Sequence, residues 1–107
     1  MRILLDECVN PRLRLAFPGE EVKTVAEMGW RSLSNGELMK EAASCFDVFV
    51  TLDQNLQFQN PTASYPLGIL VLIAQFNHIA AYRPQFAEIR DLARQTKPGQ
   101  VNLLQIQ

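Results

Sequence analysis

The 107-residue chain has few of the residues that build covalent or soft-metal frameworks. It contains one histidine and two cysteines, Cys8 and Cys45, and no Cys-x-x-Cys pair. A structural zinc site needs a full set of such ligands, and a disulfide-rich secreted domain needs several paired cysteines. We therefore exclude both classes and expect a protein of the reducing cytoplasm.

Long hydrophobic runs are also absent. The longest apolar stretch, residues 67–74, has the length of a strand and is far shorter than the roughly 18 residues that mark a membrane span. The apolar residues 3–5 are followed at once by two acids, a pattern unlike that of a signal peptide. The sequence therefore predicts no contact with a membrane.

An excess of positive charge is missing as well. Ten Lys and Arg residues face 11 Asp and Glu residues, which gives a net charge of -1. Binding of nucleic acid through bulk charge is thereby disfavoured. A local site remains possible, where metal ions or a few arginines such as Arg12, Arg31 and Arg83 supply positive charge. With 48% hydrophobic residues, the chain predicts one globular domain over residues 1–107.

Short strands and helices alternate along the chain. Ser34 and Glu37 form a capping-box pattern before one helix, and Phe86, Ile89 and Leu92 give a later helix an apolar stripe. The predicted strands are residues 2–5, 21–25, 47–51, 68–74 and a last one from residue 101, and the helices follow Asn10-Pro11, Ser34 and Pro84. This order favours a three-layer α/β/α fold with a mostly parallel central sheet of about five strands. Residues 68–74 are the most apolar strand and are expected at its centre, covered on both faces.

Acidic side chains follow the predicted strands. Asp6 and Glu7 come directly after the first strand, and Asp53 stands two residues after Thr51, which ends the third. Glu37 lies near the start of the helix that follows the second strand. Functional groups of open parallel sheets gather beyond the carboxyl ends of the strands. We therefore expect these four acids to converge on one rim.

The expected rim favours a hard metal ion. Oxygen ligands without histidine or cysteine suit Mg²⁺ or Mn²⁺, and a cation relieves the repulsion between clustered carboxylates. Such an ion polarises a phosphodiester and activates a water. The candidate catalytic residues are Asp6, Glu7, Glu37 and Asp53, of which Asp6, Glu7 and Asp53 are the candidate metal ligands. Helix capping alone is an alternative role for Glu37, and a turn or cap is one for Asp53.

Four segments resemble a known family in their order and spacing. They are residues 3–7 (Ile-Leu-Leu-Asp-Glu), residues 11–13 (Pro-Arg-Leu), Gly29 with Ser34 and Glu37-Leu38, and residues 50–53 (Val-Thr-Leu-Asp). The chain resembles the short PIN-like domains of bacterial toxin–antitoxin type, which are small relatives of the VapC ribonuclease toxins. The resemblance implies a PIN-like fold, a Mg²⁺- or Mn²⁺-dependent endoribonuclease that hydrolyses RNA, a small cognate antitoxin that blocks the rim, and a homodimer. Asp6, Glu7, Glu37 and Asp53 match the acids of the family. Asn10, Arg12, Thr51 and Asn55 are the candidate substrate contacts.

The chain departs from that pattern at three places. Relatives have Asn where Cys8 stands, often have Asp and Phe where Asn55 and Leu56 stand, and often have an arginine where Ala74-Gln75 stands. One carboxylate fewer weakens the hold on a second metal ion. The alternative is therefore a catalytically weak or inactive PIN-like binding module. Beside two carboxylates, the Cys8 thiol is expected to have a raised pKa.

A phosphoacceptor receiver domain is the other alternative. It shares an acidic pair after the first strand and an aspartate after the third, and Lys97-Pro98 resembles its Lys-Pro pair. Two features disfavour it: the strand at 68–74 ends without Ser or Thr, and Lys97-Pro98 precedes the last strand instead of following it.

Overall fold

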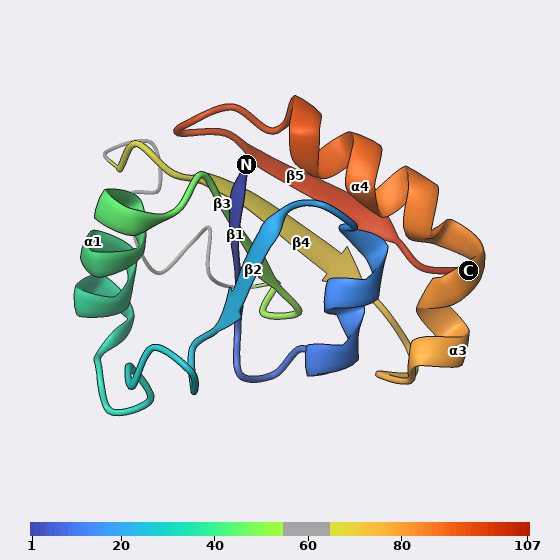
Figure 1. Ribbon diagram of the computed structural model, residues 1–107, viewed down its shortest axis with the longest axis horizontal. Helices are drawn as coiled ribbons and strands as arrows, with labels where there is room; N and C mark the ends of the chain where they lie inside the picture. The colour runs from blue at the N-terminus through green and yellow to red at the C-terminus, as the bar shows by residue number, and fades with distance from the viewer. Residues whose placement is uncertain (55–64) are drawn as a thin grey trace.

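A five-stranded, all-parallel sheet forms the centre of the protein, as Figure 1 shows for the computed structural model. The structure describes residues 1–54 and 65–107. The strand order is β2-β1-β3-β4-β5. The strands are β1 (Arg2–Leu5), β2 (Glu21–Thr24), β3 (Val48–Thr51), β4 (Gly68–Ile73) and β5 (Val101–Gln105). The α/β class and the parallel sheet are thus confirmed.

The strand order reverses between β1 and β3. Ile3 of β1 pairs with Val22 of β2 on one side and with Val48 of β3 on the other. The chain thus adds β2 on one side of β1 and then β3 on the other, which makes the position between β1 and β3 the switch point of the sheet. Ligands of open α/β sheets bind outside the carboxyl ends of the strands at such a switch point.

Helical segments cover both faces of the sheet. Helix α1 (Asn35–Cys45) packs on one face, where Leu38 and Met39 meet Phe49 of β3. The opposite face is covered by η1 (Pro11–Ala16), α3 (Ile79–Tyr82) and α4 (Phe86–Gln95), and η3 (Arg83–Gln85) joins the last two. In Figure 1, α1 and α4 accordingly lie on different sides of the strands. The result is the predicted three-layer arrangement.

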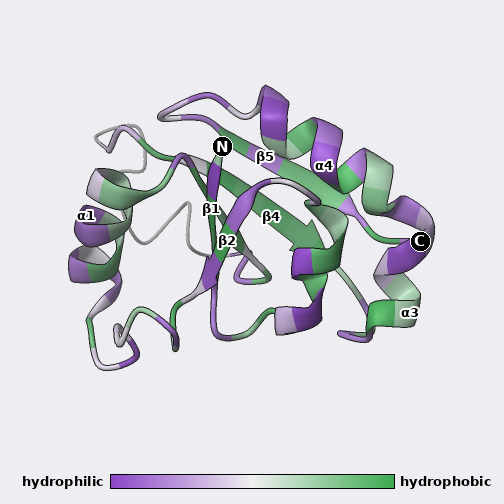
Figure 2. Ribbon diagram, viewed as in Figure 1, coloured by the Kyte–Doolittle hydropathy of each residue, from purple (hydrophilic) through white to green (hydrophobic). Residues whose placement is uncertain are grey.

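Strands β3 and β4 are the most buried. All four residues of β3 are buried, as are the first five of β4. Figure 2 shows β4 as an almost uniformly hydrophobic strand, whereas the edge strand β2 carries hydrophilic residues. Strands covered on both faces have this composition. The middle strand is β3, and the predicted central strand at 68–74 lies next to it, between β3 and β5.

The helix predicted after Asn10 is a 3₁₀ helix. The Asn10 side chain caps this helix by accepting a hydrogen bond from the Arg12 N–H at 3.0 Å. In a 3₁₀ helix, residues three apart share a face, and Leu13 and Ala16 are therefore both buried. Leu15 stands between these two residues and is 52% exposed, because the tighter turn directs it outward.

Other boundaries differ slightly from the sequence pattern. Strands β2 and β4 each end one residue earlier than expected, and α4 begins at Phe86 because Pro84 lies in η3. The short helix α3 was not predicted, since four residues carry no readable periodicity. Its buried residue is Tyr82. Within the described ranges, no helix combines the length and apolarity that crossing a bilayer requires.

Candidate functional site

An open cleft of about 400 Å³ lies at the carboxyl ends of β1 and β3, at the switch point. Its lining contains three of the four acids that the sequence analysis singled out, Asp6, Glu7 and Asp53. The remaining lining residues are Cys8, Asn35 and Leu52. Carboxylates that are distant in the sequence thus face a common space because β1 and β3 are neighbours.

Neutral donors fix the Asp6 carboxylate. The Thr51 hydroxyl donates to Asp6 Oδ2 at 2.7 Å, and the Glu7 N–H donates to Oδ1 at 2.8 Å. The Asp6 N–H continues the β1–β3 ladder by donating to the Val50 carbonyl at 2.9 Å. In the part of the chain that the structure describes, Asp6 forms no ion pair. Its negative charge is therefore oriented by dipoles and not neutralised by an arginine or lysine.

Thr51 connects the two loops of the cleft. It is fully buried at the end of β3. Besides donating to Asp6, its hydroxyl accepts a hydrogen bond from the Asp53 N–H at 3.0 Å. The sequence analysis placed Thr51 among the candidate substrate contacts, and its position makes it a group that orients Asp6 and the Asp53 loop.

The Cys8 thiol points toward the acidic side chains. Cys8 is exposed as a residue, yet its Sγ lies 3.4 Å from Asp6 Oδ2 and 3.7 Å from Thr51 Oγ1. Burial of the thiol raises its pKa, and the charge of Asp6 raises it further. The raised pKa agrees with the sequence expectation. At neutral pH, the thiol is therefore another neutral donor to Asp6.

The other acids differ in their partners. Glu7 is exposed, and Arg31 Nε lies 3.9 Å from its Oε2. Glu37 does not line the cleft: its carboxylate accepts a hydrogen bond from the Ser34 N–H at 3.1 Å and completes the predicted capping box. This hydrogen bond lowers the pKa of Glu37. Helix capping thus accounts for Glu37, whereas Asn35 at the start of the same helix reaches the cleft.

The donor chemistry of the cleft fits a hard divalent cation. Carboxylate oxygens are the protein ligands that Mg²⁺ and Mn²⁺ prefer. Among the described residues, however, no three His, Cys, Asp or Glu side chains stand together as a ready ligand group. Mg²⁺ usually takes only one or two carboxylates and completes its octahedron with waters and substrate phosphate. Asp6 with Asp53 or Glu7 would hold such an ion.

Asn77 is a residue of this edge that the sequence analysis missed. From the loop after β4, its side-chain amide donates to the Cys8 carbonyl at 2.9 Å, and its Oδ1 accepts from the Asn10 N–H at 3.0 Å. The same Oδ1 accepts from the hydroxyl of the buried Tyr82 at 2.8 Å. The Asn10 side chain completes the link by donating to the Asn77 carbonyl at 3.2 Å. Asn77 thus ties the loop after β4 to the acidic loop, a long-range contact that no local pattern announces.

Arg12 and Asn10, two further candidate substrate contacts, do not line the acidic cleft. Arg12 is exposed on a separate shallow groove with Pro11, Arg14 and Leu15 and does not line the acidic cleft. Asn10 is committed to capping η1 and to Asn77. Asn55 and Leu56 lie outside the described residues.

Comparison with known proteins adds no further constraint on the site. The chain matches no protein-family model, no curated protein and no solved structure.

Proposed function

We propose that the protein is a metal-dependent endoribonuclease with a PIN-like fold, which hydrolyses RNA phosphodiesters in the cleft between β1 and β3. One observation carries the proposal: Asp6, Glu7 and Asp53 line a single cleft at the switch point, and Asp6 is held there by neutral donors. An oriented carboxylate of this kind is suited to binding a divalent cation.

Each residue of the cleft has a distinct role in this proposal. Thr51 and the Glu7 N–H hold both oxygens of Asp6 in place, so that the carboxylate needs little reorganisation to bind the ion. Mg²⁺ or Mn²⁺ held by these carboxylates would supply positive charge for the phosphate oxygens and for activation of water. Glu7 is an exposed carboxylate of the same cleft, and its role in this proposal is to accept a proton from the attacking water. Arg31, 3.9 Å from Glu7, adds the cationic group nearest to this carboxylate.

The biological setting of the proposal comes from the resemblance of residues 3–7 and 50–53 to PIN-like toxins. We extend the proposal to a toxin of a toxin–antitoxin pair that acts in the cytoplasm. A small antitoxin would cover the acidic rim, and the toxin would act as a homodimer. The open cleft, whose carboxylates are accessible from solvent, supports this arrangement.

A catalytically inactive PIN-like binding module is the second candidate. It is favoured by the lack of a ready three-residue ligand group among residues 1–54 and 65–107. A phosphoacceptor receiver gains no support from the geometry. Lys97 precedes β5 and therefore lies at the amino ends of the strands, whereas Asp6 and Asp53 lie at the carboxyl ends.

The test is RNA cleavage with Mn²⁺ or Mg²⁺ by the wild type and by the Asp6→Asn and Asp53→Asn variants. We expect cleavage that stops on chelation and falls about 100-fold or more in either variant, a larger loss than removal of an outer partner of a metal ligand usually causes. Glu21→Gln, at the opposite edge of the sheet, is the matched control and should cleave like the wild type. A wild type that cleaves no RNA with either metal, while Mn²⁺ still binds, would favour the inactive module.

A further inference from the structure

A second groove lies at the same edge of the sheet, beyond β4 and β5. It has a volume of about 180 Å³ and is lined by Gln75, Phe76, Ala81, Ile106 and Gln107. Two hydrogen bonds fix its far wall. The Ile106 N–H donates to the Ile73 carbonyl at 2.9 Å, and the Gln107 N–H donates to Gln85 Oε1 at 2.7 Å. The groove is therefore part of the folded structure.

The groove combines an aromatic wall with amide groups. Phe76 is 58% exposed, the largest exposure among the large hydrophobic residues described. Its ring stacks on that of His78, with centroids 6.3 Å apart and an interplanar angle of 20°. Ala81 and Ile106 supply further apolar surface, and Gln75 and Gln107 carry amides that both donate and accept hydrogen bonds. Proteins recognise unpaired nucleobases with this combination, stacking on the face of the base and hydrogen-bonding its edge.

Asn77 places this groove beside the acidic cleft. It stands between Phe76 and His78 in the sequence, and its side chain is bonded to the Cys8 carbonyl and the Asn10 N–H of the acidic loop. The acidic cleft lies at the ends of β1 and β3 and this groove at the ends of β4 and β5, so the two sites follow neighbouring pairs of strands at the same edge of the sheet.

We propose that this groove is a subsite for an unpaired nucleobase of single-stranded RNA, which stacks on Phe76 while the backbone crosses the cleft of Asp6 and Asp53. The proposal rests on the proposed ribonuclease function and names its substrate class. Base-paired RNA is excluded from the groove, because a base inside a duplex cannot expose its face to a side chain.

The first test measures binding of a labelled short single-stranded RNA by fluorescence anisotropy, with Ca²⁺ in place of Mg²⁺ so that a hard cation still offsets the carboxylates of the cleft, and with a gel to confirm that the RNA stays intact. We expect the dissociation constant to rise about fivefold or more in Phe76→Leu, because stacking on an aromatic ring contributes this much per base. Phe76→Trp should bind like the wild type. Leu103→Ala, which alters another exposed apolar side chain (47%) on β5, is the control. Equal affinity of Phe76→Leu and wild type, or equal binding of a duplex, would overturn the proposal.

A second measurement reports stacking directly. A 2-aminopurine base in the same RNA should lose fluorescence on binding to the wild type and keep it on binding to Phe76→Leu. If sedimentation shows instead a dimer that dissociates in Phe76→Leu, and RNA binding is unchanged, the groove is a contact between two copies of the chain and the proposal is wrong. If the RNA base stacks on Phe76 but no metal-dependent cleavage is found, the base subsite is supported and the ribonuclease proposal is refuted. If the RNA is cleaved but no base stacks on Phe76, the ribonuclease proposal is supported and the base subsite is refuted.

Discussion

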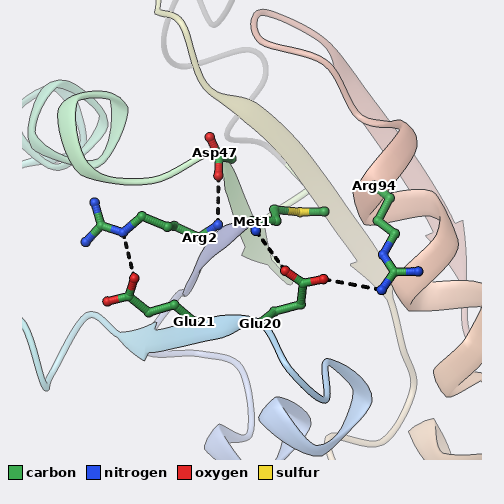
Figure 3. A network of polar contacts seen from close by, with 6 residues as sticks. All are labelled: Met1, Arg2, Glu20, Glu21, Asp47 and Arg94. Carbon is green, nitrogen blue, oxygen red and sulfur yellow. Dashed lines mark hydrogen bonds and ion pairs between the residues drawn. The ribbon is translucent and has the colours of Figure 1, made fainter.

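The two edges of the sheet use acidic residues in opposite ways. At the amino ends of the strands, Glu20 accepts hydrogen bonds from the Met1 ammonium group at 2.8 Å and from Arg94 at 3.3 Å. Figure 3 shows these contacts together with the neighbouring pair, in which Arg2 Nε lies 2.9 Å from Glu21 Oε2. Glu20 and Glu21 are thus matched with cations, while Asp47 accepts from the backbone N–H of Arg2 at 2.7 Å. The network joins the starts of β1 and β2 to α4.

At the carboxyl ends, the acids are matched differently. The partners of Asp6 among the described residues are a hydroxyl, a thiol and a backbone N–H, and Glu7 makes a long contact of 3.9 Å to Arg31. Glu20 is thus paired with cations at one edge, whereas Asp6 at the other edge is held by neutral donors. The difference teaches that the partners of an acid, more than its position after a strand, distinguish a structural role from a ligand role.

The pKa values of the amino edge reflect this pairing. The hydrogen bond with the Met1 ammonium group lowers the pKa of Glu20, and Arg94 lowers it further. The same hydrogen bond raises the pKa of the Met1 amine. Both shifts favour the charged forms, so the pair stabilises the fold in the pH range where both groups are ionised.

Among the substitutions that compare the two edges of the sheet, removal of the Thr51 hydroxyl should have the largest effect. Thr51→Val keeps the buried volume of the side chain but removes the donor to Asp6 Oδ2 and the acceptor for the Asp53 N–H. We expect metal-dependent cleavage to fall about 10- to 100-fold, as is typical when an outer partner of a metal ligand is lost. Single-turnover kinetics with titrated Mn²⁺ would measure the effect.

Thr96→Val is the matched control for this substitution. Thr96 is also a buried threonine, and its hydroxyl donates to the Leu92 carbonyl at 2.7 Å, at the amino ends of the strands. Its loss should affect stability but not cleavage. Equal losses of cleavage in the two variants would show that Thr51 acts through general stability.

A substitution at the amino ends of the strands should lower the stability of the fold and leave metal binding unchanged. In Gly68→Ala, the added Cβ would lie 2.9 Å from both Thr96 Cγ2 and the Thr96 carbonyl oxygen and 3.1 Å from the Lys97 carbonyl. Because two of these atoms are backbone, the site cannot relax easily, and we expect a loss of about 1–3 kcal/mol in the free energy of unfolding. Urea unfolding would measure it. Mn²⁺ affinity should stay unchanged, and a parallel loss of affinity would argue against the separation of the two edges.

The smallest expected effect is that of Glu20→Gln, which removes the charge at the centre of the network in Figure 3. The lowered pKa of Glu20 makes its contribution present above the unfolded value, about 4.3, and lost as the pH falls through the folded value. The raised pKa of the Met1 amine makes its contribution present below about 8 and lost as the pH rises through the folded value. Thermal unfolding should therefore show a lower melting temperature for the variant between these limits. The difference in melting temperature between the wild type and the variant should become smaller below and above this pH range. Glu41→Gln on α1 is the control, and a pH-independent difference would contradict the account.

Much of the fold could be predicted because its signals are local. The buried strands at β3 and β4, the capping box at Ser34 and the breaks at Gly29 and Gly99 all depend on neighbouring residues. The 3₁₀ form of η1 and the outward position of Leu15 were not predictable in this way. They depend on how six residues pack against α4 and the sheet.

The site shows the same division. Asp6, Glu7 and Asp53 could be predicted at a common edge because each follows a strand, and parallel strands end together. Glu37 was expected there as well, but its own capping pattern accounts for its contacts. Asn77 could not be predicted, since its partners Cys8 and Asn10 lie 69 and 67 residues away in the sequence.

The most direct test of the central claim is Mn²⁺ binding, measured by the EPR signal of the free ion during titration of the wild type, Asp6→Asn and Glu20→Gln. The account predicts saturable binding to the wild type, affinity that is weaker by about tenfold or more in Asp6→Asn, and unchanged affinity in Glu20→Gln. Absence of saturable binding, or an Asp6→Asn variant that binds Mn²⁺ as tightly as the wild type, would contradict it.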